Sequence, residues 1–193
     1  MKIETVSFSE KGRYVTLRLS GVKNSLVITS QLYSELSSPT KGDELSPEAY
    51  DRIAEGDEYY RATVRALHIL SYSDNSRRRL YDKLRQRGIS KRACESVVSD
   101  MVSLGYLDEQ KQLRGLVLRL ANESLLGPYK IMSKLSASGY SPSDIRSAMS
   151  ELSRGGEIDF EENLNKLIEK RLAEDEPEGE LMKLKYKWGY TRC

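Results

Sequence analysis

Hydrophobic residues recur at helical spacing through most of the chain after residue 57. Leu80, Tyr81 and Leu84 make one apolar stripe among polar neighbours, which predicts a short amphipathic helix. A second helix is predicted after Ser90, whose hydroxyl can accept a hydrogen bond from the free N–H groups of the first turn. The inward face of this second helix is expected to hold Val97, Val98, Met101 and Leu104.

Glycines punctuate these helices at regular intervals. Gly88 and Gly105 each follow an apolar stripe, and glycine ends helices in the left-handed conformation without a steric penalty. The pair returns 51 residues later as Gly139 and Gly156, and a further shift of 50 leads from Gly139 to Gly189. Apolar positions return with them: Leu80 matches Ile131, Leu84 matches Leu135, Cys94 matches Ile145 and Met101 matches Leu152. This period predicts stacked three-helix units, each too small to bury its apolar face alone.

Residues 3–30 have a different pattern. Val15, Leu17 and Leu19 alternate with polar residues, as expected of a strand with one buried face. Turns at Gly12 and near Gly21 divide the segment into three short strands. The predicted fold class is therefore mainly α, with tandem three-helix repeats in an elongated, curved array after a small N-terminal β-meander.

The predicted boundaries divide the chain into four parts. Residues 1–56 hold the meander, a linker and two short helices, one near residues 31–36 and one from Ser46 through Ile53. The first repeat spans 57–107, the second 108–158, and a truncated third repeat 159–193. Each predicted helix start has a matching signal: Asp57 opens the first repeat, Asp108 the second, Gly127-Pro128 and Ser141-Pro142 its later helices, and Asp159 the third repeat.

Composition limits the classes of protein that this chain can belong to. With 38% hydrophobic and 31% charged residues it fits a helix-rich soluble protein with thin cores. Cys94 falls on a predicted core position and Cys193 is the last residue, so we expect neither a disulfide framework nor a metal site. The first residues lack an apolar signal core, and no run reaches the ~18 apolar residues of a membrane span. A cytoplasmic location is expected.

The sequence offers no catalytic constellation. Its one histidine, His68, matches Arg119 and Glu169 in the other repeats, which predicts an exposed helical position and not a site. No glycine-rich phosphate loop, zinc-ligand spacing or nucleophile elbow is present. Tyr81, Tyr106 and Tyr140 stand where the repeats place apolar residues and are expected in the core. The prediction is a protein that is not an enzyme and needs no cofactor.

Charge is distributed unevenly along the chain. Residues 77–92 carry eight positive charges and one negative, at Asp82, whereas residues 154–180 carry four positive and ten negative. The eight cations are the candidate partner- or DNA-binding residues: Arg77, Arg78, Arg79, Lys83, Arg85, Arg87, Lys91 and Arg92. An ordinary solvated helix face is the alternative. The matching helix of the second repeat carries only Lys130 and Lys134, so packing does not require the excess, and an acidic partner is favoured.

These residues resemble the RecX family of RecA regulators. Ser76, Leu80, Leu84 and Gly88 resemble its S-x-x-E-L-x-x-K-L-x-x-K-G helix, although Arg79 replaces the glutamate. Residues 105–108 resemble its G-Y-L-D turn, and residues 127–139 its second-repeat G-x-x-x-I-x-x-x-L-x-x-x-G pattern. Lys41–Leu45 resemble the K-G-D-x-L segment that precedes the repeats in some members, so the likeness covers almost the whole chain.

The resemblance implies a monomeric modulator that binds the RecA filament on single-stranded DNA and inhibits its recombinase and ATPase activities, with a role in homologous recombination, DNA repair and the SOS response. It implies contact with RecA protein and with the DNA in the filament. Two other interpretations stay open on the residues alone. One is a nucleic-acid-binding helical module that acts without RecA, and the other is a scaffold for a different acidic protein.

Overall fold

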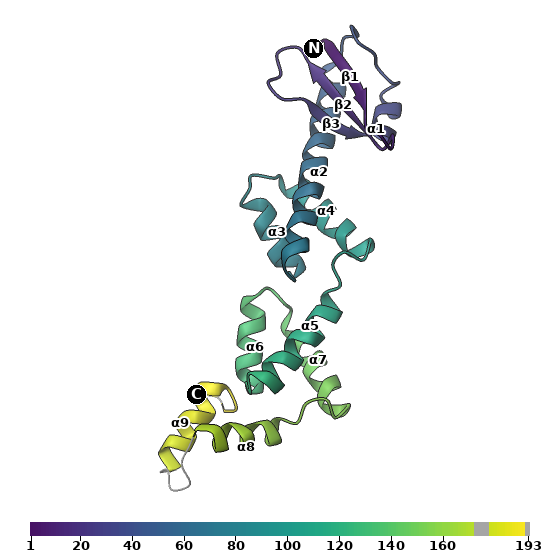
Figure 1. The fold of residues 1–193 in the computed structure, drawn as a ribbon. Coiled ribbons are helices and arrows are strands. Elements are labelled where there is room, and N and C mark those ends of the chain that lie inside the picture. The colour runs from purple at the N-terminus through teal and green to yellow at the C-terminus, as the bar shows by residue number, and fades with distance from the viewer. Residues whose placement is uncertain (172–177, 192–193) are drawn as a thin grey trace. The chain divides into compact units, whose positions relative to one another are not determined.

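The computed structural model describes residues 1–171 and 178–191. The chain folds in the order β1 (Ile3–Phe8), β2 (Tyr14–Leu19), β3 (Leu26–Thr29), α1 (Ser30–Glu35), α2 (Pro47–Tyr72), α3 (Arg77–Arg85), α4 (Lys91–Ser103), α5 (Glu109–Leu118), π-helix η1 (Arg119–Glu123), α6 (Pro128–Ala137), α7 (Pro142–Arg154), α8 (Phe160–Arg171) and α9 (Glu178–Trp188) (Figure 1). The expected mainly α fold with an N-terminal meander is confirmed.

Internal packing divides the chain into two units. The first contains Met1–Ser73 and Leu80–Tyr106, and the second contains Asp74–Arg79 and the residues from Leu107 onward. The first turn of α3 therefore packs with the second unit. The four-part division of the chain and the curved array stay predictions.

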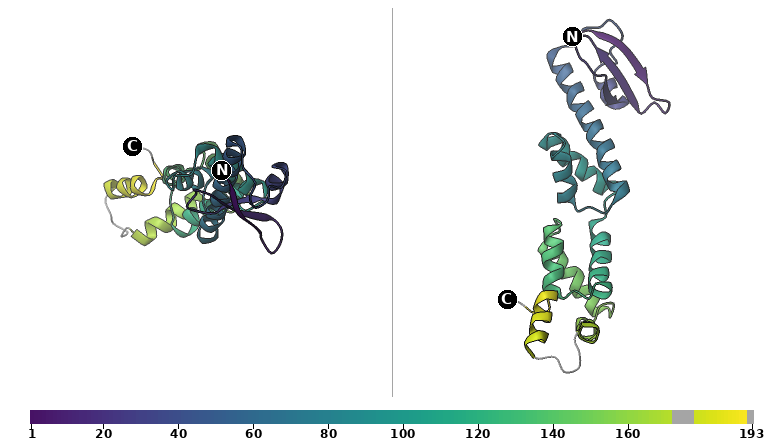
Figure 2. Two further views of the ribbon diagram at one scale, coloured as in Figure 1. Left: turned by 90° about the horizontal axis from the view of Figure 1, so that it is seen from above. Right: turned by 60° about the vertical axis from the view of Figure 1, so that its left-hand side comes forward.

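The N-terminal strands form an antiparallel sheet in the order β1-β2-β3. Between β2 and β3, Val15 lies opposite Ile28. Two residues further along β2, Leu17 lies opposite Leu26. The predicted inward residues Val15, Leu17 and Leu19 are all fully buried, and Ile53 of α2 joins the same core. The sheet lies against the N-terminal half of α2, which covers the meander as a two-layer unit requires (Figure 2).

Helix α2 corrects one expectation. Two helices were predicted, one ending at Ile53 and another starting at Asp57, but a single helix runs from Pro47 to Tyr72. Gly56 lies inside this helix and does not break it. Its missing side chain lets α2 pack closely against α1, because a methyl group at this position would lie 2.6 Å from Leu32 Cδ2. Asp57 does not cap a helix either. Its buried carboxylate accepts a hydrogen bond of 2.9 Å from the N–H of Val27 in β3.

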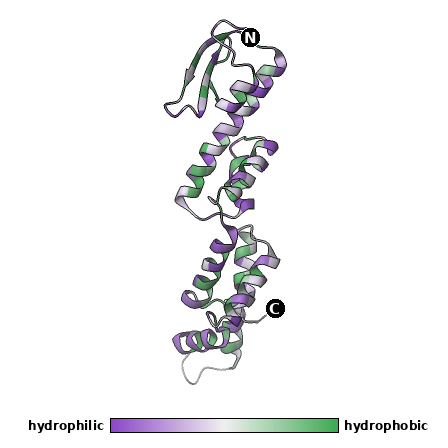
Figure 3. Ribbon diagram, turned by 90° about the vertical axis from the view of Figure 1, so that its right-hand side faces the viewer, coloured by the Kyte–Doolittle hydropathy of each residue, from purple (hydrophilic) through white to green (hydrophobic). Residues whose placement is uncertain are grey.

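Helices α3 and α4 bury the stripes that the sequence predicts. Leu80, Leu84, Cys94, Val97 and Met101 are almost fully enclosed, and Gly88 and Gly105 take positive φ angles of 80° and 73°. Figure 3 shows both apolar (green) and polar (purple) positions along these helices, as expected of amphipathic helices. The predicted cap is also present, since Ser90 Oγ accepts from the N–H of Ala93.

Two residues near Gly105 were predicted wrongly. Leu104 is 67% exposed and Tyr106 is 58% exposed, although both were expected inside. Helix α4 ends at Ser103 and the chain turns at Gly105, so Leu107 becomes the buried residue. Of the other tyrosines expected in the core, Tyr140 is buried and Tyr81 is half-buried.

The second unit has its own core, formed by residues of α5, η1, α6 and α7. Asp108 caps α5 as predicted, by accepting a hydrogen bond from Lys111 N–H. Ser141 stands at the N-cap of α7 but makes no side-chain cap, because its hydroxyl bonds to Ser143 Oγ instead. The π-helix η1 was not expected from the sequence.

Helix α8 begins at the capping residue that the sequence predicts. Asp159 accepts hydrogen bonds from the N–H groups of Glu161 and Glu162 at the start of α8, and Gly189 after α9 has φ of 81°. Residues 172–177, which are part of the acidic segment 154–180, and the terminal Cys193 lie outside the described residues.

Candidate partner-binding surface

The eight candidate cations lie on α3, on the turn after it and on the first turn of α4. Lys83 is half-buried and the other seven are exposed. Leu80 and Leu84 hold α3 to the core with zero exposure, so most of its other positions face outward. The amphipathic spacing of α3 therefore explains why so many cations are presented on a nine-residue helix.

Three of these cations have carboxylate partners. Arg77 pairs with Glu109 at 3.1 Å, Lys91 with Glu95 at 3.8 Å and Arg92 with Glu55 at 3.0 Å. Two of the three carboxylates come from helices distant in sequence, α5 and α2. The expectation that only Asp82 opposes the basic residues is thus wrong, and the available positive charge is smaller than the sequence count.

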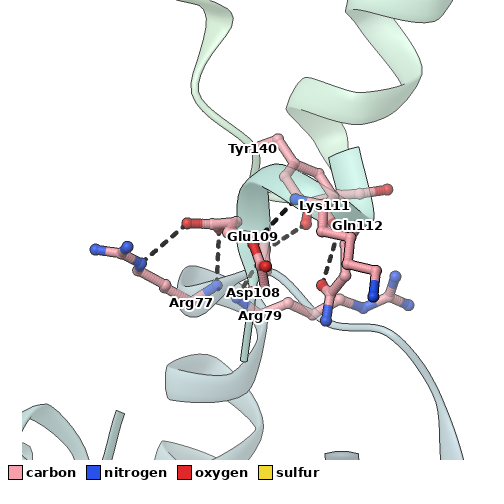
Figure 4. Close-up of polar contacts among 9 residues, drawn as sticks. Arg77, Arg79, Asp108, Glu109, Lys111, Gln112 and Tyr140 are labelled. Carbon is pink, nitrogen blue, oxygen red and sulfur yellow. Dashed lines mark hydrogen bonds and ion pairs between the residues drawn. The ribbon is translucent and has the colours of Figure 1, made fainter. Parts of the chain in front are cut away.

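Arg77 is held most firmly. One oxygen of Glu109 accepts its backbone N–H at 2.9 Å, and the other accepts its guanidinium Nε at 3.1 Å (Figure 4). Glu109 therefore satisfies one of the unpaired N–H groups at the start of α3 and neutralises the side chain as well. We assign Arg77 a structural role in anchoring the first turn of α3.

Buried Tyr140 lies in the same cluster (Figure 4). Burial raises its pKa to about 12, and the nearby carboxylates of Glu109 and Asp74 add to the rise. The phenol is therefore neutral over the physiological pH range.

Three cations make neither an ion pair nor a side-chain hydrogen bond within the described part of the chain: Arg78, Arg79 and Arg87. Arg85 donates to the carbonyl of Ile89 and so stays near the turn. A guanidinium that is exposed and unpaired keeps all its donors available for carboxylate or phosphate. Arg78 and Arg79 in the second unit and Arg87 in the first unit are therefore the strongest individual candidates for contact with a partner.

Sequence reasoning missed a groove within the first unit. It has a volume of about 420 Å³ and is lined by α2 residues together with the turn after α3: Tyr60, Arg61, Val64, Arg65, His68, Arg87 and Ile89. His68 is exposed, as predicted, but it belongs to this basic lining. The spacing of Arg61, Arg65 and His68 at i, i+4 and i+7 was the available signal, because it places them on one helix face.

The described residues contain no group of three or more His, Cys, Asp or Glu side chains arranged to hold a metal ion. Cys94 is buried, and burial raises the pKa of its thiol, which makes it a packing residue. Among the helices of residues 1–171 and 178–191, none is long and apolar enough to cross a membrane.

Known proteins with similar sequences and folds share one description. A family model described as RecX, first three-helix domain, matches residues 62–101. The regulatory protein RecX of Stenotrophomonas maltophilia strain K279a is 31% identical over 114 residues, covering 59% of this chain and 67% of that protein. RecX of Clostridioides difficile strain 630 is 29% identical over 131 residues, covering 68% of this chain and 60% of that protein.

A crystal structure of regulatory protein RecX has the same fold, with a TM-score of 0.70 at 22% identity over 95% of this chain and 89% of that one. The fold and surface define a helical-repeat protein with an N-terminal sheet and an exposed cluster of arginines. The chain belongs to the RecX family of regulatory proteins.

Proposed function

We propose that this protein binds the filament that RecA forms on single-stranded DNA and lowers the recombinase and ATPase activities of that filament. Membership of the RecX family carries the proposal. The unpaired, exposed Arg78 and Arg79 support it, because a RecA filament presents acidic side chains and DNA phosphates.

The test is a titration of the ATPase activity of RecA on single-stranded DNA with wild-type protein and with the double variant Arg78→Glu and Arg79→Glu. We expect the concentration for half-inhibition to rise about tenfold or more, since losing ~1.4 kcal/mol of binding energy suffices for that change. Arg77 is left unchanged because its ion pair with Glu109 makes it part of the fold.

A matched control carries Lys111→Glu and Arg146→Glu, two exposed positions of the second unit outside the candidate set. It makes the same change in net charge and should inhibit like the wild type. Equal inhibition by the Arg78/Arg79 variant, with helicity retained by circular dichroism, would remove these arginines from the mechanism. Tight binding to naked DNA in a gel shift, without an effect on RecA, would support the nucleic-acid module instead.

A further inference from the structure

Two helix starts in the second unit each dock on a glycine turn. Ser76, just before α3, donates its hydroxyl to the carbonyl of Ser138 at 2.8 Å. Gly139 follows with φ of 89°, and a methyl group on it would lie 2.7 Å from Ser76 Oγ. The turn after α6 therefore receives the residues that open α3.

One repeat further along the chain, the turn after α9 receives the start of α6. The N–H of Gly127 donates to the carbonyl of Trp188 at 2.8 Å, and the N–H of Tyr129 donates to the carbonyl of Gly189 at 3.0 Å. Both donors are among the N–H groups at a helix start that have no partner inside the helix. In both contacts, carbonyl oxygens after the end of one helix take donors from the beginning of another.

The corresponding turn of the first repeat is open. Arg87 and Gly88 match Ser138 and Gly139 at a shift of 51. A methyl group on Gly88 would meet no atom of the described residues within 4 Å. Among those residues, no hydrogen bond ends on the carbonyl oxygen of Arg87 or Gly88. The turn after α3 thus offers the kind of acceptor that the other two turns use.

A basic groove lies beside this open turn, within the first unit. It is the groove of about 420 Å³ lined by Arg87, Ile89 and one face of α2, and we call it the Arg65–Arg87 groove. Both arginines are exposed and make neither an ion pair nor a side-chain hydrogen bond within residues 1–171 and 178–191. Arg61 is 67% exposed beside its partner Asp57. No residue of the lining is acidic, so the groove presents positive charge that its own lining does not compensate.

Two other grooves of the described chain differ in this respect, because each has carboxylates beside its cations. One lies between α5 and α7, and its charged lining residues are Asp108, Lys111, Arg114, Asp144 and Glu151. The other lies between α2 and α4, and its charged lining residues are Arg52, Glu55, Glu58 and Arg92. The charge excess is therefore particular to the Arg65–Arg87 groove.

The open turn and the charge of the groove together define the occupant. Carbonyl oxygens need N–H donors, whereas arginines need the oxygens of carboxylate or phosphate. A phosphate group of nucleic acid offers acceptors alone, so it would satisfy the arginines and leave the carbonyls open. A helix with Asp or Glu in its first turn offers both, because its first N–H groups are free and the helix dipole favours acidic side chains beside them.

We propose that the Arg65–Arg87 groove is a docking site for a helix of a partner protein that carries Asp or Glu in its first turn. The N–H groups of that turn bind the carbonyls of Arg87 and Gly88, and its carboxylates bind the two arginines. The site belongs to the first unit and is separate from Arg78 and Arg79 of the second. The inference stands whichever protein supplies the helix, and so it does not rest on the proposed action on RecA.

Fluorescence anisotropy with two labelled peptides of identical composition tests the proposal. Both are alanine-rich, stapled and about 20 residues long, so that they are helical. One carries an N-cap serine followed by three glutamates in its first turn, and the other carries the same residues in its last turn. The full chain should bind the first peptide at least about tenfold more tightly, because only this peptide presents carboxylates and free N–H groups together.

Two groove variants test which residues bind the first peptide. Arg65→Glu with Arg87→Glu should weaken binding at least about tenfold, because like charges then face each other. Arg65→Gln with Arg87→Gln should also weaken it, without a reversal of charge. Both positions are exposed, so circular dichroism should show retained helicity. The Lys111→Glu and Arg146→Glu protein has the same change in net charge as the first variant and should bind like the wild type.

Three results would overturn the proposal: equal binding of the two peptides, groove variants that bind the first peptide like the wild type, or a wild type that binds neither. Binding of labelled oligo(dT) that the groove variants lose, with the first peptide unbound, would assign the groove to nucleic acid instead. A wild type that binds the first peptide through the two arginines without inhibiting RecA would remove the proposed function and support this docking site.

Discussion

Five glycines with positive φ illustrate how one residue type serves different purposes. Gly88, Gly105 and Gly156 have open space where a side chain would stand, so their role is conformational. Gly139 and Gly189 have the same backbone conformation and are also packed against another segment. A substitution at Gly139 or Gly189 therefore has two costs, a strained backbone conformation and a steric clash with the neighbouring segment.

Gly139→Ala should destabilise the protein more than Gly88→Ala. Both variants place an L-residue at positive φ, which costs ~1–2 kcal/mol. Only at Gly139 does the new methyl group also meet Ser76 Oγ and, at 3.2 Å, Arg78 Cβ, so we expect ~1 kcal/mol of further loss. Urea unfolding of both variants measures the difference. Equal losses would mean that the turn after α6 yields to the methyl group.

The buried phenol of Tyr140 links stability to alkaline pH. Its pKa is about 12 in the folded protein and about 10 in an unfolded chain. The stabilising contribution is thus complete below pH 10 and is lost as pH rises from 10 toward 12. Tyr140→Phe should show a smaller fall in urea midpoint between pH 8 and pH 11 than the wild type. Tyr72→Phe, at a side chain 78% exposed, is the control and should behave like the wild type.

At the scale of elements, α2 is the helix that joins the sheet to the first repeat within the first unit. Its length of 26 residues depends on Gly56, which passes close to β3 and α1, and on Asp57, which binds the backbone of β3. Local signals at these two positions indicate a break and a cap. Packing against Ile28 and Leu32 and the hydrogen bond from Val27 override both signals.

Two helix-interior glycines should respond oppositely to alanine. Gly115 in α5 faces open space, so Gly115→Ala should stabilise the protein by ~0.5–1 kcal/mol through helix propensity. In α2, the methyl group of Gly56→Ala would lie 2.6 Å from Leu32 Cδ2 and 3.0 Å from Ile28 Cγ2, so a loss of ~1 kcal/mol or more is expected. Denaturation midpoints compare the two. Stabilisation at both positions would show that α2 has room to shift.

At the scale of the whole molecule, charge is the property on which the proposed binding to RecA rests. The net charge is only +2, yet residues 77–92 carry eight cations and residues 154–180 carry ten anions. The structure neutralises some of the cations internally, at Arg77, Lys91 and Arg92. The cations without an ion pair create a local positive potential, which attracts a negatively charged partner over about a Debye length.

Binding to RecA filaments should therefore weaken as salt increases. Exposed cation–anion contacts are screened at high ionic strength, so raising salt from 50 to 200 mM should raise the half-inhibiting concentration several-fold. The Arg78/Arg79 variant should show a shallower dependence than the wild type because it has fewer contacts to screen. A salt-independent titration would point to an apolar interface.

The sequence by itself determined the features that depend on neighbouring residues. The apolar stripe of Leu80 and Leu84, the helix ends at Gly88 and Gly139 and the cap at Asp108 follow from periodicity and backbone preference. These signals are local, and at these positions the tertiary packing agrees with them. The 50-residue repeat then follows from comparing the segments with each other.

Only the tertiary structure decided which distant residues meet. It paired Arg77 with Glu109, exposed Leu104, packed Gly139 against Ser76 and left Gly88 open beside the basic groove. Each of these outcomes depends on where the chain returns after tens of residues, because ion pairs and close packing act over a few ångströms of space and are indifferent to separation along the sequence.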